Sequence, residues 1–181
     1  ALATSDRNVA IDLSANGHGV TVKQTAVASG IAPPSIVGDV RFGGGNDEMT
    51  LAGSSTFIGN ADFGGGTDKL TIGGTAAFSG GLLNSQGLAV SVSGGTFDVA
   101  GAATISSLAV TDKGVLGVTL DGGTTGTALQ VTGNASFGAD SKLALKLTSI
   151  DNAEGQHIVL TAGSLTGTNN LTTSSTLMPF L

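Results

Sequence analysis

The sequence predicts an all-β chain that folds as a parallel β-helix, a solenoid of roughly eight turns. Its composition combines Val, Leu, Ile and Ala with 30 Gly and 7 Phe and no Trp or Tyr, which suits many short strands joined by tight corners. The segment FGGGNDEMTLAG at 42–53 returns as FGGGTDKLTIGG at 63–74. An antiparallel sandwich or barrel would also have short strands, but it would not by itself produce a 21-residue sequence repeat.

Each repeat is expected to contain a strand, a corner and a second strand. Residues 42–59 and 63–80 share nine identities in eighteen positions, and a weaker form of the pattern recurs at 97–105 and 129–137. The first two apolar positions of each copy lie two residues apart and therefore share one face of a strand. One copy cannot bury that face alone, so the copies must stack. The residues expected to build the stack are the ladder residues Phe42, Phe57, Phe63 and Phe78 and the corner residues Gly53, Gly74, Gly101 and Gly133.

The remaining elements follow the same period of two. Residues 9–22, VAIDLSANGHGVTV, read as a strand, an Asn-Gly turn and a return strand. Pro33 and Pro34 would break a central strand and mark a turn or an excursion at an edge. Residues 88–99, 114–123 and 141–149 alternate apolar with small or polar side chains and are expected to be strands.

Charge and composition exclude several function classes. The chain has 7 Lys+Arg against 13 Asp+Glu and a formal net charge of -6, which argues against nucleic acid or anionic lipid as a partner. No apolar stretch approaches the roughly 20 residues of a membrane-spanning helix, and no start typical of a signal peptide is present. The absence of Cys excludes disulfides and thiolate sites.

The two glycine tracts offer the most specific candidate site. They resemble the RTX calcium repeat, whose turns supply aspartate and carbonyl oxygens to Ca²⁺, at the second and fourth Gly and at Asp47 and Asp68. However, Phe replaces the first Gly, and the copies recur at 21 residues rather than at nine. We therefore expect structural corners in which Asp47 and Asp68 stack as a solvated ladder or cap a turn, with a weak Ca²⁺ site as the alternative.

Other catalytic patterns are incomplete. The tracts lack the Gly-Lys-Ser/Thr or strand-turn-helix context of a phosphate cradle. Asp12 and His18 are too close in sequence for a subtilase-like triad, and His157 has no partner at a metal-ligand spacing. Stacked Asp47 and Asp68 would match a glycosidase carboxylate separation, but any stacked repeat places like residues at that spacing. No catalytic or cofactor-binding residue is assigned.

Residues 107–167, with LQVTGNASFGADSKLALKL and then GQHIVLTAGSLTG, resemble the C-terminal part of the passenger of a Gram-negative autotransporter (type V secretion). The repeats upstream and the closing TLMPFL fit the same family, so the resemblance covers roughly 36–181. It implies a right-handed parallel β-helix, in which 1–106 form repeat turns and 107–181 form the cap of the same solenoid. In that family the last turns act as a folding nucleus during secretion.

The resemblance implies a non-enzymatic segment at the cell surface or outside the cell, serving as stalk, adhesive scaffold and folding template. Its implied partners are the outer-membrane translocator barrel of the same precursor and the surface of a host or sister cell. Two rival functions stay open. The solenoid could belong to a secreted hydrolase, protease or esterase, with its active site upstream or across turns, or it could be a calcium-dependent binding module.

Overall fold

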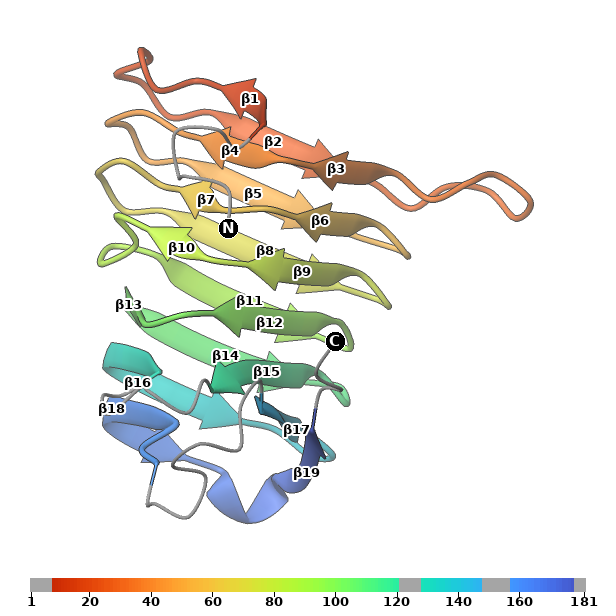
Figure 1. The fold of residues 1–181 in the computed structure, drawn as a ribbon, viewed down its shortest axis with the longest axis vertical. Coiled ribbons are helices and arrows are strands. Elements are labelled where there is room, and N and C mark those ends of the chain that lie inside the picture. The colour runs from red at the N-terminus through yellow and green to blue at the C-terminus, as the bar shows by residue number, and fades with distance from the viewer. Residues whose placement is uncertain (1–7, 121–127, 148–156, 178–181) are drawn as a thin grey trace.

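The computed structural model describes residues 8–120, 128–147 and 157–177, and within them the chain winds as a parallel β-helix with three sheets (Figure 1). Sheet A contains β1 (Val9–Asp12), β4 (Asp39–Arg41), β7 (Ala61–Asp62) and β10 (Leu82–Leu83). Sheet B contains β2 (Thr21–Gln24), β5 (Glu48–Leu51), β8 (Lys69–Gly73), β11 (Ala89–Ser93), β13 (Ala103–Ile105), β14 (Ser107–Thr111), β16 (Leu129–Phe137) and β18 (Leu160–Thr166). Sheet C contains β3 (Ser35–Val37), β6 (Thr56–Ile58), β9 (Ala77–Gly80), β12 (Thr96–Ala100), β15 (Val115–Leu120), β17 (Lys142–Leu147) and β19 (Thr172–Leu177). A short 3₁₀ helix, η2 (Thr168–Asn170), precedes β19.

The sequence repeat equals one turn of the solenoid. In sheet B, Met49 pairs with Leu70, and in sheet C, Phe57 pairs with Phe78. Sheet C has seven strands, one for each turn of the described chain, where the repeat length predicted roughly eight turns. The difference arises because later turns are longer than 21 residues: Val115 pairs with Lys142, and Lys142 pairs with Thr172.

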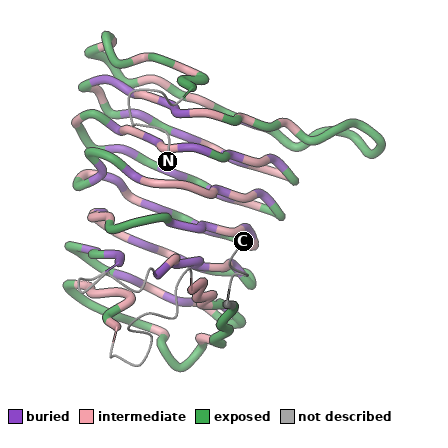
Figure 2. Tube along the Cα trace, in the orientation of Figure 1, coloured by how far each residue is buried: buried purple, intermediate pink, exposed green. Residues whose placement is uncertain are grey.

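The core is a continuous apolar column inside the three sheets. Inward and outward positions alternate along the strands, so that buried and exposed segments alternate along the trace (Figure 2). The ring of Phe42 stacks on Phe63 with centroids 5.1 Å apart, and Phe57 stacks on Phe78 at 4.9 Å. Phe97 extends the second ladder by one turn, at 5.5 Å from Phe78. All five rings are fully buried, so turns are joined by side chains as well as by backbone hydrogen bonds.

Glycine is required at the corners for two reasons. Gly53 and Gly74 have φ values of 68° and 71°, in the left-handed region that other residues avoid. They also stack, and a Cβ on Gly74 would lie 2.9 Å from the Gly53 carbonyl oxygen. Gly101 likewise has a positive φ.

The prediction for Gly133 is wrong, because this residue lies inside β16 and not in a turn. The pairing partner of β16 changes around this residue: the first part of β16 pairs with β13 and the last part with β14. A Cβ at Gly133 would lie 2.7 Å from the Ser106 carbonyl oxygen below, so close backbone approach explains the glycine.

In the first turn, the connection from β1 to β2 is a corner, whereas the connection from β2 to β3 is a long arm. The predicted return strand after Asn16 and Gly17 is wrong as a hairpin, because β1 and β2 belong to different sheets and follow each other around a corner. Between β2 and β3, residues 25–34 project away from the solenoid as a long arm (Figure 1). Pro33 and Pro34 lie at the return of this arm, where a strand cannot continue.

Candidate functional site

The glycine tracts at 43–45 and 64–66 are stacked corners between sheets A and B. A Cβ on Gly43 would lie 1.7 Å from the Asn16 carbonyl oxygen, and one on Gly64 would lie 1.9 Å from the Gly43 carbonyl oxygen. The Gly65 amide donates to the Gly43 carbonyl at 3.1 Å, one turn away. The tracts therefore bring backbone against backbone at their first and third glycines, whereas a Cβ on the middle glycine, Gly44 or Gly65, would meet nothing within 4 Å.

Asp47 and Asp68 follow these corners and cap them from inside. Asp47 Oδ1 accepts a hydrogen bond from the Val20 amide, and Asp68 Oδ1 accepts one from the Asp47 amide, both at 2.8 Å. Their exposed fractions are only 2% and 1%, so the expectation of a solvated ladder is wrong. Each carboxylate instead accepts from a backbone amide of the preceding turn. The pattern contained the signal: Asp47 lies two residues before buried Met49 and shares its inward face.

The chemistry of this pair differs from that of an open calcium site. The Oδ2 atoms of both aspartates are buried and have no hydrogen-bond partner. Calcium takes six to eight oxygen ligands, and the described ranges contain no group of three or more His, Cys, Asp or Glu residues that could hold a metal. Calcium binding at Asp47 and Asp68 stays a prediction from sequence, to be tested by the measurement given in the Discussion.

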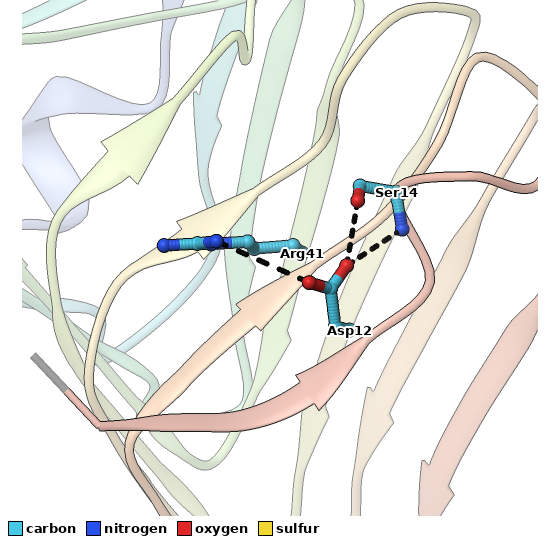
Figure 3. Close-up of polar contacts among 3 residues, drawn as sticks. All are labelled: Asp12, Ser14 and Arg41. Carbon is cyan, nitrogen blue, oxygen red and sulfur yellow. Dashed lines mark hydrogen bonds and ion pairs between the residues drawn. The ribbon is translucent and has the colours of Figure 1, made fainter. Parts of the chain in front are cut away.

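The outer face of sheet A carries a row of charged side chains in register. Asp12 pairs with Arg41, and Arg41 pairs with Asp62 in the next turn. Asp12 accepts hydrogen bonds on Oδ1 from the Ser14 hydroxyl at 2.6 Å and the Ser14 amide at 3.1 Å, while its Oδ2 lies 4.0 Å from Arg41 Nη1 (Figure 3). The Ser14 bonds, and to a lesser degree the Arg41 charge, lower the pKa of Asp12 below its ordinary value.

A hollow of about 450 Å³ lies beside this row. Its walls include Ser14, Asp39, Arg41, Asn60, Asp62 and Leu83. Part of this polarity serves the fold: Asp39 Oδ1 accepts from the Asn60 amide, Asn60 Oδ1 accepts from the Gly81 amide, and Asp62 Oδ1 accepts from Asn84 Nδ2. The remaining groups offer hydrogen bonds and one guanidinium to a polar ligand, without an evident nucleophile and base pair.

The two histidines occupy unrelated places. His18 lies in the exposed corner between β1 and β2, where its amide donates to Asn16 Oδ1 at 3.0 Å. His157 is half-buried and borders an apolar hollow of about 350 Å³, with Leu116, Phe137 and Leu143 among its neighbours. The structure brings neither histidine into a group of metal-ligating residues within its described parts.

Sequence reasoning missed the ion pair between Asp12 and Arg41 and a second pair between more distant turns. Lys146 Nζ on β17 donates to Asp98 Oδ2 on β12, although the two strands are separated by β15. The contact is possible because Gly117, which pairs with Asp98, has no side chain, and a Cβ there would lie 2.8 Å from Asp98 Oδ1. The spacing of the two residues in sequence follows no repeat, so no pattern could have identified the pair.

Comparison with protein-family models, with curated proteins and with solved structures found no match for this chain. In the part of the chain that the structure describes, no helix has the length and apolar character needed to cross a membrane. Function must therefore be argued from the architecture and from the residues themselves.

Proposed function

We propose that this chain is a non-enzymatic, extracellular β-helical segment of a bacterial autotransporter passenger. In this role it is a surface stalk and adhesive scaffold, and its last turns are a template on which earlier turns fold during secretion. Its partners are then the outer-membrane barrel of the same precursor and the surface of a host or a sister cell. The proposal rests on the resemblance of the sequence together with the architecture of the chain.

The observation that carries the proposal is the stack of in-register turns around one apolar column. Each formed turn presents parallel strand edges and a floor of buried side chains, such as Phe63 below Phe42. A new turn gains hydrogen bonds and apolar contact on arrival and closes only a short loop against its neighbour. Such a structure extends by addition at one end, which suits a chain that leaves a membrane gradually.

The polar outer surface of the solenoid also supports a scaffold role. Outward positions of sheet B are largely hydroxyl-bearing, with Thr50, Thr71 and Ser91 in register on three successive strands. The exposed Glu48 and Lys69 lie on two of these strands, while charged residues are 11% of the whole chain. A polar, weakly charged face stays hydrated and attracts neither nucleic acid nor anionic lipid, as a surface stalk requires.

The direction of folding is testable with a matched pair of variants in the full chain. Leu129 on β16 and Leu70 on β8 are both fully buried. If folding begins in the last turns, Leu129→Ala will slow refolding in proportion to its loss of stability, whereas Leu70→Ala will mainly accelerate unfolding. Refolding and unfolding rates as a function of urea distinguish the two, and a larger refolding defect for Leu70→Ala would contradict the template role.

A further inference from the structure

Asp47 and Asp68 form a buried carboxyl pair in the wall of the solenoid. They occupy the same position in consecutive turns, because Glu48 and Lys69, the residues that follow them, are partners in the β5 and β8 ladder. Adjacent strands lie about 4.8 Å apart, so two ionised carboxylates here would be close neighbours. With exposed fractions of 2% and 1%, neither has water to screen the other.

The hydrogen bonds of the pair satisfy only half of its oxygens. One amide donates to each Oδ1 atom, whereas both Oδ2 atoms are buried without a partner. An ionised carboxylate is an acceptor at both oxygens, and leaving a charged oxygen dry and without a donor is costly. A protonated carboxyl group removes the charge and avoids most of that cost.

No cation compensates the pair within the described residues. In the turn before it, His18 and Lys23 are exposed, and the flanking Glu48 and Lys69 are exposed as well. In the turn after it, residues 84–93 contain no charged side chain, and the fully buried Leu88 takes the aspartate position. Asp68 thus lies between Asp47 on one side and an apolar turn on the other.

We propose that the folded protein holds one proton on this pair, at Asp68, and that the corner is a pH-sensitive element which strengthens the solenoid in acid. Burial raises the pKa of Asp68 above its ordinary value, and the charge of Asp47 raises it further, while the hydrogen bond from the Asp47 amide acts in the opposite direction. The proposal concerns regulation of stability and does not depend on the proposed passenger role.

The sign of the effect follows from proton binding. Between the ordinary pKa of an aspartate and the raised pKa of Asp68, the folded chain binds more protons at this site than the unfolded chain does. The free energy of unfolding therefore falls as pH rises through that window and grows as the medium becomes acid. Most carboxylates that accept hydrogen bonds in a folded protein have the opposite effect, because their lowered pKa makes the protein less stable in acid.

The test compares the wild-type chain with Asp68→Asn, which keeps an Oδ1 acceptor for the Asp47 amide but cannot titrate. Urea midpoints are measured at pH 7 and at about pH 5, where an ordinary aspartate is still ionised. We expect the wild-type midpoint to rise relative to that of Asp68→Asn on acidification. An infrared spectrum at about pH 5 should show a protonated carboxyl band in the wild type that Asp68→Asn lacks.

Asp112→Asn provides the matched control. Asp112 accepts hydrogen bonds from Ser93 and Thr111, which lower its pKa. Because it is ionised in the folded and the unfolded chain at both pH values, its removal should leave the change in midpoint between pH 7 and about pH 5 as it is in the wild type. Asp68→Leu, with the side chain that the next turn carries, provides a second variant if the asparagine does not fold. Equal pH dependence of the wild type and both Asp68 variants, or identical protonated-carboxyl bands in the wild type and Asp68→Asn, would overturn the proposal.

Discussion

Phe63 shows how one side chain joins two turns of the solenoid. It is fully buried, and its ring stacks at 13° on that of Phe42. The sequence predicts this ladder because identical residues 21 apart must superpose when the turns stack. The burial of the aspartates was harder to predict. An aspartate after a glycine tract is typical of a solvated turn, and only the spacing of two residues between Asp47 and Met49 indicates that Asp47 faces inward.

We expect Phe63→Ala to destabilise the protein by about 3–5 kcal/mol, because it removes a fully buried ring and leaves a cavity in the column. Phe63→Leu, which keeps most of the volume, should cost less than about 1.5 kcal/mol. Both values come from urea unfolding followed by far-UV circular dichroism. A cost below about 1 kcal/mol for the alanine variant would show that the ladder is not essential to the core.

At the scale of elements, the sequence predicts the pairing of strands within the repeat more reliably than it predicts contacts between turns of unequal length. The pairing of β5 with β8 and of β6 with β9 follows from sequence identity, since the offset fixes the register. The contact between Lys146 on β17 and Asp98 on β12 cannot be predicted in this way, because the turns between the two strands differ in length and the contact needs a glycine in the intervening strand β15. The strand position of Gly133 was missed for a related reason, since Gly133 resembles the corner glycines in sequence but lies in β16, where a neighbouring backbone carbonyl leaves no space for a Cβ.

The ion pair between Lys146 and Asp98 is predicted to fix β17 onto the earlier turns. Lys146→Met should destabilise the protein by about 1–3 kcal/mol, less than for a fully buried pair because the lysine side chain is 38% exposed. The loss arises because Asp98, which is 11% exposed at its side chain, remains charged without its partner.

Lys142→Met is the matched control, because Lys142 lies on the same strand and is exposed. It should change the urea midpoint little. Asp98→Asn combined with Lys146→Met should recover part of the stability lost in the single lysine variant. Equal effects of the two lysine variants would show that general charge, and not this contact, determines the result.

At the scale of the whole molecule, the fold class could be predicted because the repeat, the composition and the period of two all point to one architecture. The sequence predicted roughly eight turns, and sheet C has seven strands in the described residues, because the later turns are longer than 21 residues. The division at residue 106 and the role of 107–181 remain expectations of the resemblance.

Thermal unfolding in EDTA and in millimolar Ca²⁺ tests the rival calcium module. We expect the same melting temperature in both, because the Oδ1 atoms of Asp47 and Asp68 already accept backbone hydrogen bonds and their Oδ2 atoms are inaccessible. A ligand that binds only the folded state raises its stability by mass action. A clear rise of the melting temperature with Ca²⁺ would therefore show that these corners bind calcium and would support the calcium-dependent module instead.

Because one sequence repeat forms one turn, the number of repeats determines the length of the solenoid. Because residues 42–62 form one complete turn whose ends meet equivalent residues above and below, a duplicated or deleted copy changes the length of the rod by one strand spacing, about 4.8 Å, without altering its cross-section. Duplication or loss of such a segment thus yields chains that differ in length while keeping the same core. The length of the solenoid can therefore be changed through copy number alone.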